Sequence, residues 1–93
     1  MSNLMTLLAN WRRQRQYADN GTVIRAISFL HPDHATALMI SRVSFLPIFR
    51  TFAALERLQA QGIVERGVRL DLDAPRFVYR RVAGVGNDRV RRP

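Results

Sequence analysis

The sequence predicts a mostly α-helical fold closed by a β-hairpin, because two kinds of apolar spacing divide the chain. As far as residue 61, apolar residues recur every three or four positions, as in helices with one buried face. From Ile63 onward they alternate with polar residues, as in half-buried strands. A length of 93 residues with 47% hydrophobic residues suits one globular unit with tails.

The first helix is expected over about 3–18, where Leu4, Leu8 and Trp11 lie at helical spacing. These three side chains form an apolar stripe that can pair with the stripe of a second copy across a twofold axis. We therefore assign them to a homodimer interface. Packing of the stripe against the chain's own core explains it equally well.

Two more helices are expected before residue 43. The Asp19-Asn20-Gly21 segment predicts a break, followed by a helix over about 22–30 with Thr22 as its cap. His31-Pro32-Asp33 interrupts that pattern, and its aspartate is a good cap for a short helix over about 34–42.

A longer helix and a hairpin complete the prediction. The helix covers about 46–61 and stops at Gly62. Strands are expected over about 63–72 and 76–82, joined by the turn signal Asp73-Ala74-Pro75. One strand face holds the alternating apolar residues Val64, Val68, Leu70 and Leu72.

Helices followed by a two-stranded wing make the winged variant of the helix-turn-helix, whose later helix enters the DNA major groove. The run from Leu55 to Arg66, LERLQAQGIVER, resembles MarR-like and PadR-like transcriptional regulators. In those families a recognition helix with leucines three apart leads into a glycine and an apolar strand. The resemblance covers about 34–82 and implies a DNA-binding regulator.

The charge indicates a polyanionic partner. Fifteen basic residues, all arginine, stand against seven acidic ones, which gives a formal charge of +8 and a pI near 11.7. Arginine suits phosphate oxygens and the guanine edge, although a GC-rich coding bias explains the all-arginine usage about as well.

The helix expected over 46–61 has two faces when it is projected at ~100° per residue. Ile48, Phe52 and Leu55 fall on one side, extended by Phe45 and Leu58, and this side is expected to face the core. The opposite side is expected to form an exposed ridge of Arg50, Ala54, Arg57 and Gln61.

On this ridge we assign Arg50 to base-edge contact, because the amino-terminal half of a recognition helix usually goes deepest into the groove. Small Ala54 would let the helix approach closely, and Thr51 would reach a base or a phosphate. Arg57 lies two turns later, where phosphate contact is expected.

The turn before this helix and the strands after it add candidate phosphate contacts. At the turn, Ser44 has a second interpretation as a helix cap. At the wing, contact stays open, because Asp71 and Asp73 near its tip would be repelled by phosphate. The remaining predicted DNA-binding residues are Arg42, Arg69, Arg76, Arg80 and Arg81.

The chain is not expected to catalyse a reaction. There is no cysteine, and His31 and His34 with one aspartate are more typical of a turn and cap than of a metal site. No phosphate loop or nucleophile motif is present, so neither a cofactor nor a small-molecule ligand is expected. Without a membrane-length apolar run or a leader signal, a cytoplasmic location is the default expectation.

These patterns divide the chain into an amino-terminal helix over 1–20, a winged-helix domain over 21–83 and a basic tail over 84–93. The first hypothesis is a dimeric, sequence-specific regulator of double-stranded DNA, most simply a repressor. The second is an architectural or partition protein that coats DNA with little sequence preference. The third is a protein docking module in which Phe45, Leu46 and Phe49 are anchors, with Arg50 and Arg57 bonded internally.

Overall fold

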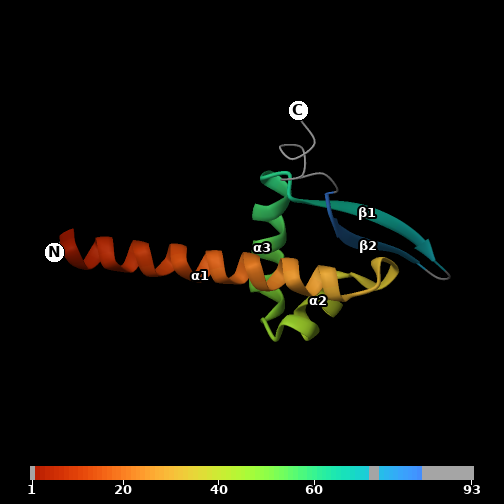
Figure 1. The fold of residues 1–93 in the computed structure, drawn as a ribbon, viewed down its shortest axis with the longest axis horizontal. Helices are drawn as coiled ribbons and strands as arrows, with labels where there is room; N and C mark the ends of the chain where they lie inside the picture. Colours follow the sequence, from red (N-terminus) through yellow and green to blue (C-terminus); the bar gives the residue numbers. More distant parts are fainter. Residues whose placement is uncertain (1, 72–73, 83–93) are drawn as a thin grey trace, which may run out of the picture.

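The computed structural model describes residues 2–71 and 74–82, which form helices followed by an antiparallel hairpin (Figure 1). The predicted helix-rich fold with one hairpin is therefore confirmed. In chain order the elements are α1 (Ser2–Phe29), the 3-10 turn η1 (Pro32–His34), α2 (Ala37–Ser44), α3 (Ile48–Ala60), β1 (Val64–Asp71) and β2 (Ala74–Arg81). Leu72 and the predicted tail over 84–93 lie outside the described residues.

α1 is one unbroken helix of 28 residues, so the predicted break at Asp19-Asn20-Gly21 is wrong. Thr22 is not a cap either, since its hydroxyl donates to the carbonyl of Ala18 at 2.9 Å within the same helix. Asp19 and Asn20 both accept hydrogen bonds from arginines of α3, and these tertiary bonds outweigh the weak helix propensity of the segment. The boundary predicted between residues 20 and 21 falls inside α1.

The first part of α1 projects from the body of the molecule (Figure 1). Every residue from 3 to 18 is exposed, including Trp11, whose exposed fraction is 57%. We call residues 3–18 the arm. The interpretation that its apolar stripe covers the chain's own core is wrong, because the core begins at Asp19 and Val23.

The short helix begins later than predicted. Asp33 does not cap it, because Asp33 lies in η1, where its backbone N–H donates to Nδ1 of His31 at 3.1 Å. Thr36 is the cap instead, with its hydroxyl accepting from the N–H of Met39 at 3.3 Å. α2 ends at Phe45, which adopts the left-handed conformation with φ of 59°.

The hairpin pairs Val64 with Arg81 at its base and Asp71 with Ala74 near its turn. Val64, Val68 and Leu70 share one face, which confirms the predicted alternation for these residues. At the base of this face, Val64 and Tyr79 are buried and close the core. The backbone N–H of Tyr79 also donates to the carbonyl of Ala35 at 2.9 Å, so the segment between η1 and α2 lies along β2.

One core joins all five helices and strands. Its most deeply buried large side chains are Val23 of α1, Ile40 of α2, and Leu55 and Leu58 of α3. The predicted core positions Leu55 and Leu58 are thus confirmed.

Replacing Gly21 with alanine should raise the free energy of unfolding by roughly 0.5–1 kcal/mol, because a glycine inside a helix costs about that much relative to alanine. An added Cβ would meet only the flexible end of Arg25, at 3.4 Å. Denaturant unfolding followed by circular dichroism measures the change. Gly62→Ala is the control and should destabilise, because Gly62 has φ of +74°. A destabilised Gly21→Ala variant would contradict the continuous helix.

Candidate functional site

The face of α3 that the sequence assigns to DNA is buried. Thr51 and Ala54 each have an exposed fraction of 0%, whereas Ile48 and Phe52 are 41% and 47% exposed. The predicted exposed ridge and the DNA contacts of Thr51 and Ala54 are therefore wrong. Compared with the predicted orientation, α3 is rotated about its own axis, because α1 packs against the side that carries Ala54 and Arg50. The rotation is somewhat less than the ~100° that separates successive residues of a helix.

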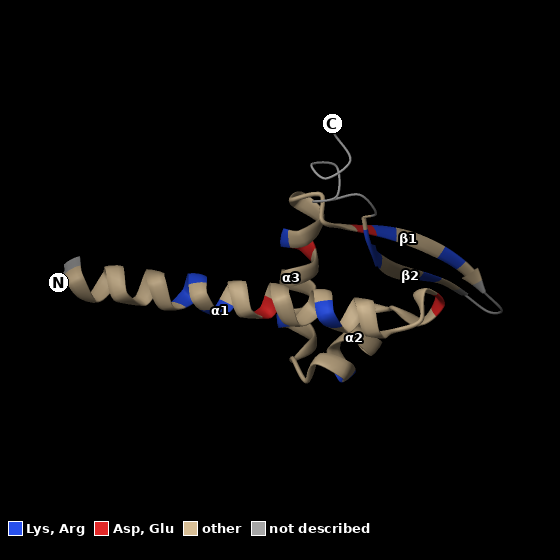
Figure 2. Cartoon of the chain, in the orientation of Figure 1, with Lys and Arg blue, Asp and Glu red and all other residues tan. Residues whose placement is uncertain are grey.

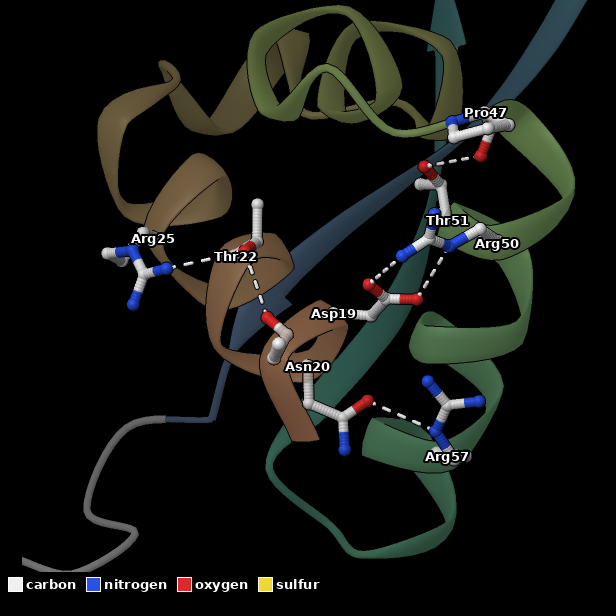
Figure 3. Close-up of polar contacts among 9 residues, drawn as sticks. Asp19, Asn20, Thr22, Arg25, Pro47, Arg50, Thr51 and Arg57 are labelled. Carbon is white, nitrogen blue, oxygen red and sulfur yellow. Dashed lines mark hydrogen bonds and ion pairs between the residues drawn. The ribbon is translucent and has the colours of Figure 1, made fainter. Parts of the chain in front are cut away.

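An ion pair fixes this orientation (Figure 3). Arg50 donates from Nε to Asp19 at 3.0 Å and from Nη2 to the other carboxylate oxygen at 2.6 Å. The side chains of Arg50 and Asp19 are only 28% and 8% exposed. The hydrogen bond to Asp19 raises the pKa of Arg50 above its ordinary value, against the opposing effect of burial.

A second bond lies two turns along the same interface (Figure 3), where Nε of Arg57 donates to the side-chain oxygen of Asn20 at 3.1 Å. Both arginines of the predicted ridge are thus engaged by consecutive residues of α1. Arg50 has its fork occupied by a carboxylate, which removes the geometric basis for its base-edge assignment.

The turn before α3 is held by its hydroxyl groups. Ser44 belongs to α2 and donates to the carbonyl of Ile40 at 2.6 Å, so it does not cap α3, whose N-cap is Pro47. Ser41 donates to the carbonyl of Leu46 at 2.6 Å. Arg42 lies exposed in the last turn of α2.

Three of the four predicted hairpin arginines share one face. Arg69 and Arg76 are directly opposite each other, and Arg80 lies on the same side four residues after Arg76. Arg81 is on the other side, opposite Val64. We call Arg69, Arg76 and Arg80 the basic face of the hairpin.

Acidic residues offset part of the charge of this face. Arg69 donates to the backbone carbonyl of Asp33 at 3.1 Å and lies 3.2 Å from its carboxylate. Arg80 pairs with Glu65, and the two side chains are 74% and 44% exposed. The register also places Asp71 on this side of the hairpin.

Further arginines lie on the middle of the arm (Figure 2). Arg12, Arg13 and Arg15 are exposed, and the guanidinium of Arg15 lies 5.5 Å from the ring centre of Trp11. The sequence from residue 2 to 18 holds no acidic residue. The basic surface is therefore distributed over the arm and the hairpin, and α3 contributes little to it.

An apolar surface lies where DNA was expected. Phe45 and Phe49 are exposed, Phe45 to 92%. Phe52 lines an open hollow of about 450 Å³ together with Leu38 of α2 and Phe77 of β2. The sequence named Phe45, Leu46 and Phe49 as docking anchors, and it also placed Phe45 on the core side of the helix, which its exposure shows to be wrong. It gave no signal for Leu38 or Phe77, because their exposure depends on how α2 and β2 meet α3.

The described residues contain no group of three side chains placed to hold a metal ion. Within the same part of the chain, no single helix is long and apolar enough to cross a membrane. α2 and α3 reach that length and composition only together, across a bend of 112°.

No protein-family model, curated protein or solved structure matches the chain. The likeness to MarR-like and PadR-like regulators therefore stays a prediction from the residues that carry it.

Removing one partner of the Asp19–Arg50 pair should be costly. Asp19→Ala leaves a partly buried guanidinium without its acceptor, and the free energy of unfolding should fall by about 1–3 kcal/mol. The double variant with Arg50→Ala should lose less than the sum of the two single changes, which chemical denaturation in a double-mutant cycle measures.

Glu65→Ala is the matched control, because it removes the acidic partner of an exposed pair, worth less than about 1 kcal/mol. Equal effects of Asp19→Ala and Glu65→Ala, with additive energies in the cycle, would show that the α1–α3 pair does not hold the fold.

Proposed function

We propose that this chain is a winged-helix protein that binds the backbone of double-stranded DNA with little sequence preference and catalyses no reaction. The observation that carries the proposal is the basic face of the hairpin, where Arg69 and Arg76 oppose each other beside Arg80. Guanidinium groups bind phosphate oxygens in a fork geometry, and such contacts carry no sequence information.

The order of elements supports the winged-helix assignment. Three helices precede the hairpin, and the bond from Tyr79 to Ala35 adds a short third segment beside β2. In this arrangement β1 and β2 form the wing and α3 occupies the position of a recognition helix.

The side chains of α3 favour backbone binding over reading of bases. The exposed surface of a groove-reading helix normally carries hydrogen-bonding side chains. Here that surface carries Ile48, Phe49 and Phe52, with Glu56 as the only acidic residue of α3. A carboxylate and phenyl rings are poor partners for DNA, which favours backbone binding over the site-specific regulator of the first hypothesis.

The protein docking hypothesis is favoured by one specific observation. It required Phe45, Leu46 and Phe49 to be exposed while Arg50 and Arg57 were bonded internally. Phe45, Phe49 and the two arginines are arranged in that way, whereas Leu46 is partly buried against the core. The docking surface and the basic face of the hairpin meet at Arg76, which also lines the hollow beside Phe52.

The DNA-binding proposal is tested by fluorescence anisotropy with DNA from upstream of the protein's own gene and with random DNA of equal length, over a salt series. We expect similar affinities for both and a steep fall with salt, because phosphate contacts release counterions. A preference of ~10³ or more for the upstream DNA would overturn sequence independence. No binding at low salt would overturn DNA binding altogether.

The hairpin's part is tested by the double variant Arg76→Gln with Arg80→Gln. The slope of log K against log salt should become shallower by roughly 2, because each lost phosphate contact removes about 0.9 from it. The matched control is Arg25→Gln with Arg66→Gln, which removes the same charge from exposed positions outside the basic face. Equal losses in both variants would exclude the hairpin as the binding face.

A further inference from the structure

Two apolar surfaces are left largely exposed among the residues that the structure describes, although Arg15 lies beside Trp11 and Arg66 lies over the Phe77 ring. One is the stripe on the arm, made of Leu4, Leu7, Leu8 and Trp11, all more than half exposed. The other is the apolar face of α3 with the hollow beside it, made of Phe45, Ile48, Phe49, Phe52, Leu38 and Phe77. Exposed apolar clusters of this size mark contact sites.

The shapes of the two surfaces are complementary. The stripe places its side chains at i, i+3, i+4 and i+7 of a helix, which is the pattern by which an amphipathic helix binds a hydrophobic groove. The hollow beside Phe52 is open, holds about 450 Å³ and is lined mostly by aromatic and aliphatic side chains, together with Thr36 and Arg76. Leucine and tryptophan side chains are of the size that fills such a groove.

The groove carries charges of both signs, since Arg76 lines the hollow and a carboxylate lies further along α3. The arm carries Arg12, Arg13 and Arg15 next to its stripe and no acidic residue. Glu56 lies exposed on α3, one turn after Phe52. An arm bound along α3 would bring basic side chains to the only carboxylate of that helix.

The arm cannot reach the hollow of its own chain. α1 is continuous from Ser2 to Phe29, so the arm points away from the body along the axis of the helix that packs against α3 (Figure 1). An isolated helical extension of about 16 residues is marginal in water, and a partner is needed to stabilise it. No described residue outside α1 covers the arm, whose residues 3–18 are all exposed, and a second chain can supply the partner.

We propose that the occupant of the α3 groove is the arm of a second copy of this chain, so that two chains exchange their arms. Reciprocal exchange buries both apolar surfaces of both chains, whereas pairing of one arm with the other leaves the phenylalanines of α3 in water. It also keeps α3 out of the DNA groove and leaves Arg69 and Arg80 of each hairpin outside the hollow, which Arg76 lines. The association does not depend on DNA and is testable without it.

The first measurement is the mass of the full chain in solution by sedimentation over a range of concentrations. We expect a dimer whose dissociation constant rises roughly 30-fold or more in the arm variant Leu8→Glu with Trp11→Glu, and by a similar factor in the groove variant Phe49→Glu with Phe52→Glu. All four positions are exposed in the single chain, and circular dichroism checks that each variant folds. Tyr17→Glu, at an exposed position of α1 outside the stripe, is the matched control and should leave the dimer intact.

Mixing the two variants separates arm exchange from the alternatives. The arm variant retains a groove and the groove variant retains an arm, so the mixture should associate although neither variant does so alone. Trp11 is the only tryptophan of the chain, so all tryptophan emission in the mixture comes from the arm of the groove variant. We expect this emission to shift to shorter wavelength when the arm variant is added.

Three outcomes would overturn the proposal. A wild-type chain that stays monomeric at all concentrations would exclude association. A groove variant that dimerises like the wild type would show that arms pair with arms. Loss of the dimer in both variants without recovery in the mixture would show that each surface binds its own counterpart.

Discussion

The contact between Asp19 and Arg50 decides which side of α3 faces the solvent. A carboxylate that is 8% exposed and accepts two hydrogen bonds from one guanidinium fixes both the rotation and the distance of the helices it joins. With Arg57 held by Asn20 two turns further on, α3 cannot turn its arginines outward without leaving charges unpaired. The exposure of Phe49 and Phe52 follows from this rotation.

Much of the fold could be predicted because it depends on local spacing. The spacing of apolar residues predicts the side of an element that faces the core, whichever element packs against it. This holds for Leu55 and Leu58 of α3 and for the shared face of Val64, Val68 and Leu70. The continuity of the helix through Asp19-Asn20-Gly21 could not be predicted. Local propensity favours a turn there, and the bonds that keep it helical come from residues 31 and 37 positions away.

The candidate site was harder to predict than the fold for a related reason. A helical projection of α3 shows two faces, one with three large apolar residues and one with two arginines, and hydrophobicity assigns the first to the core. The choice reverses here because α1 supplies a carboxylate and an amide oxygen that accept hydrogen bonds from the second face. The sequence named Arg69, Arg76 and Arg80 among its candidates together with Arg42 and Arg81, and the pairing register of the hairpin is what places these three on one face.

The continuity of α1 has a consequence for how the chain tolerates insertions and deletions. Arm and core share one helix with no joint between them, so the direction of the stripe is set by helical phase as well as by its own residues. One residue added between Trp11 and Asp19 would turn Leu4 and Leu8 by ~100° about the axis while leaving the core unchanged. Seven added residues, close to two full turns, would nearly restore the direction and move the stripe outward by ~10 Å. The number of residues between Trp11 and Asp19 therefore sets both the distance of the stripe from the core and its direction about the helix axis.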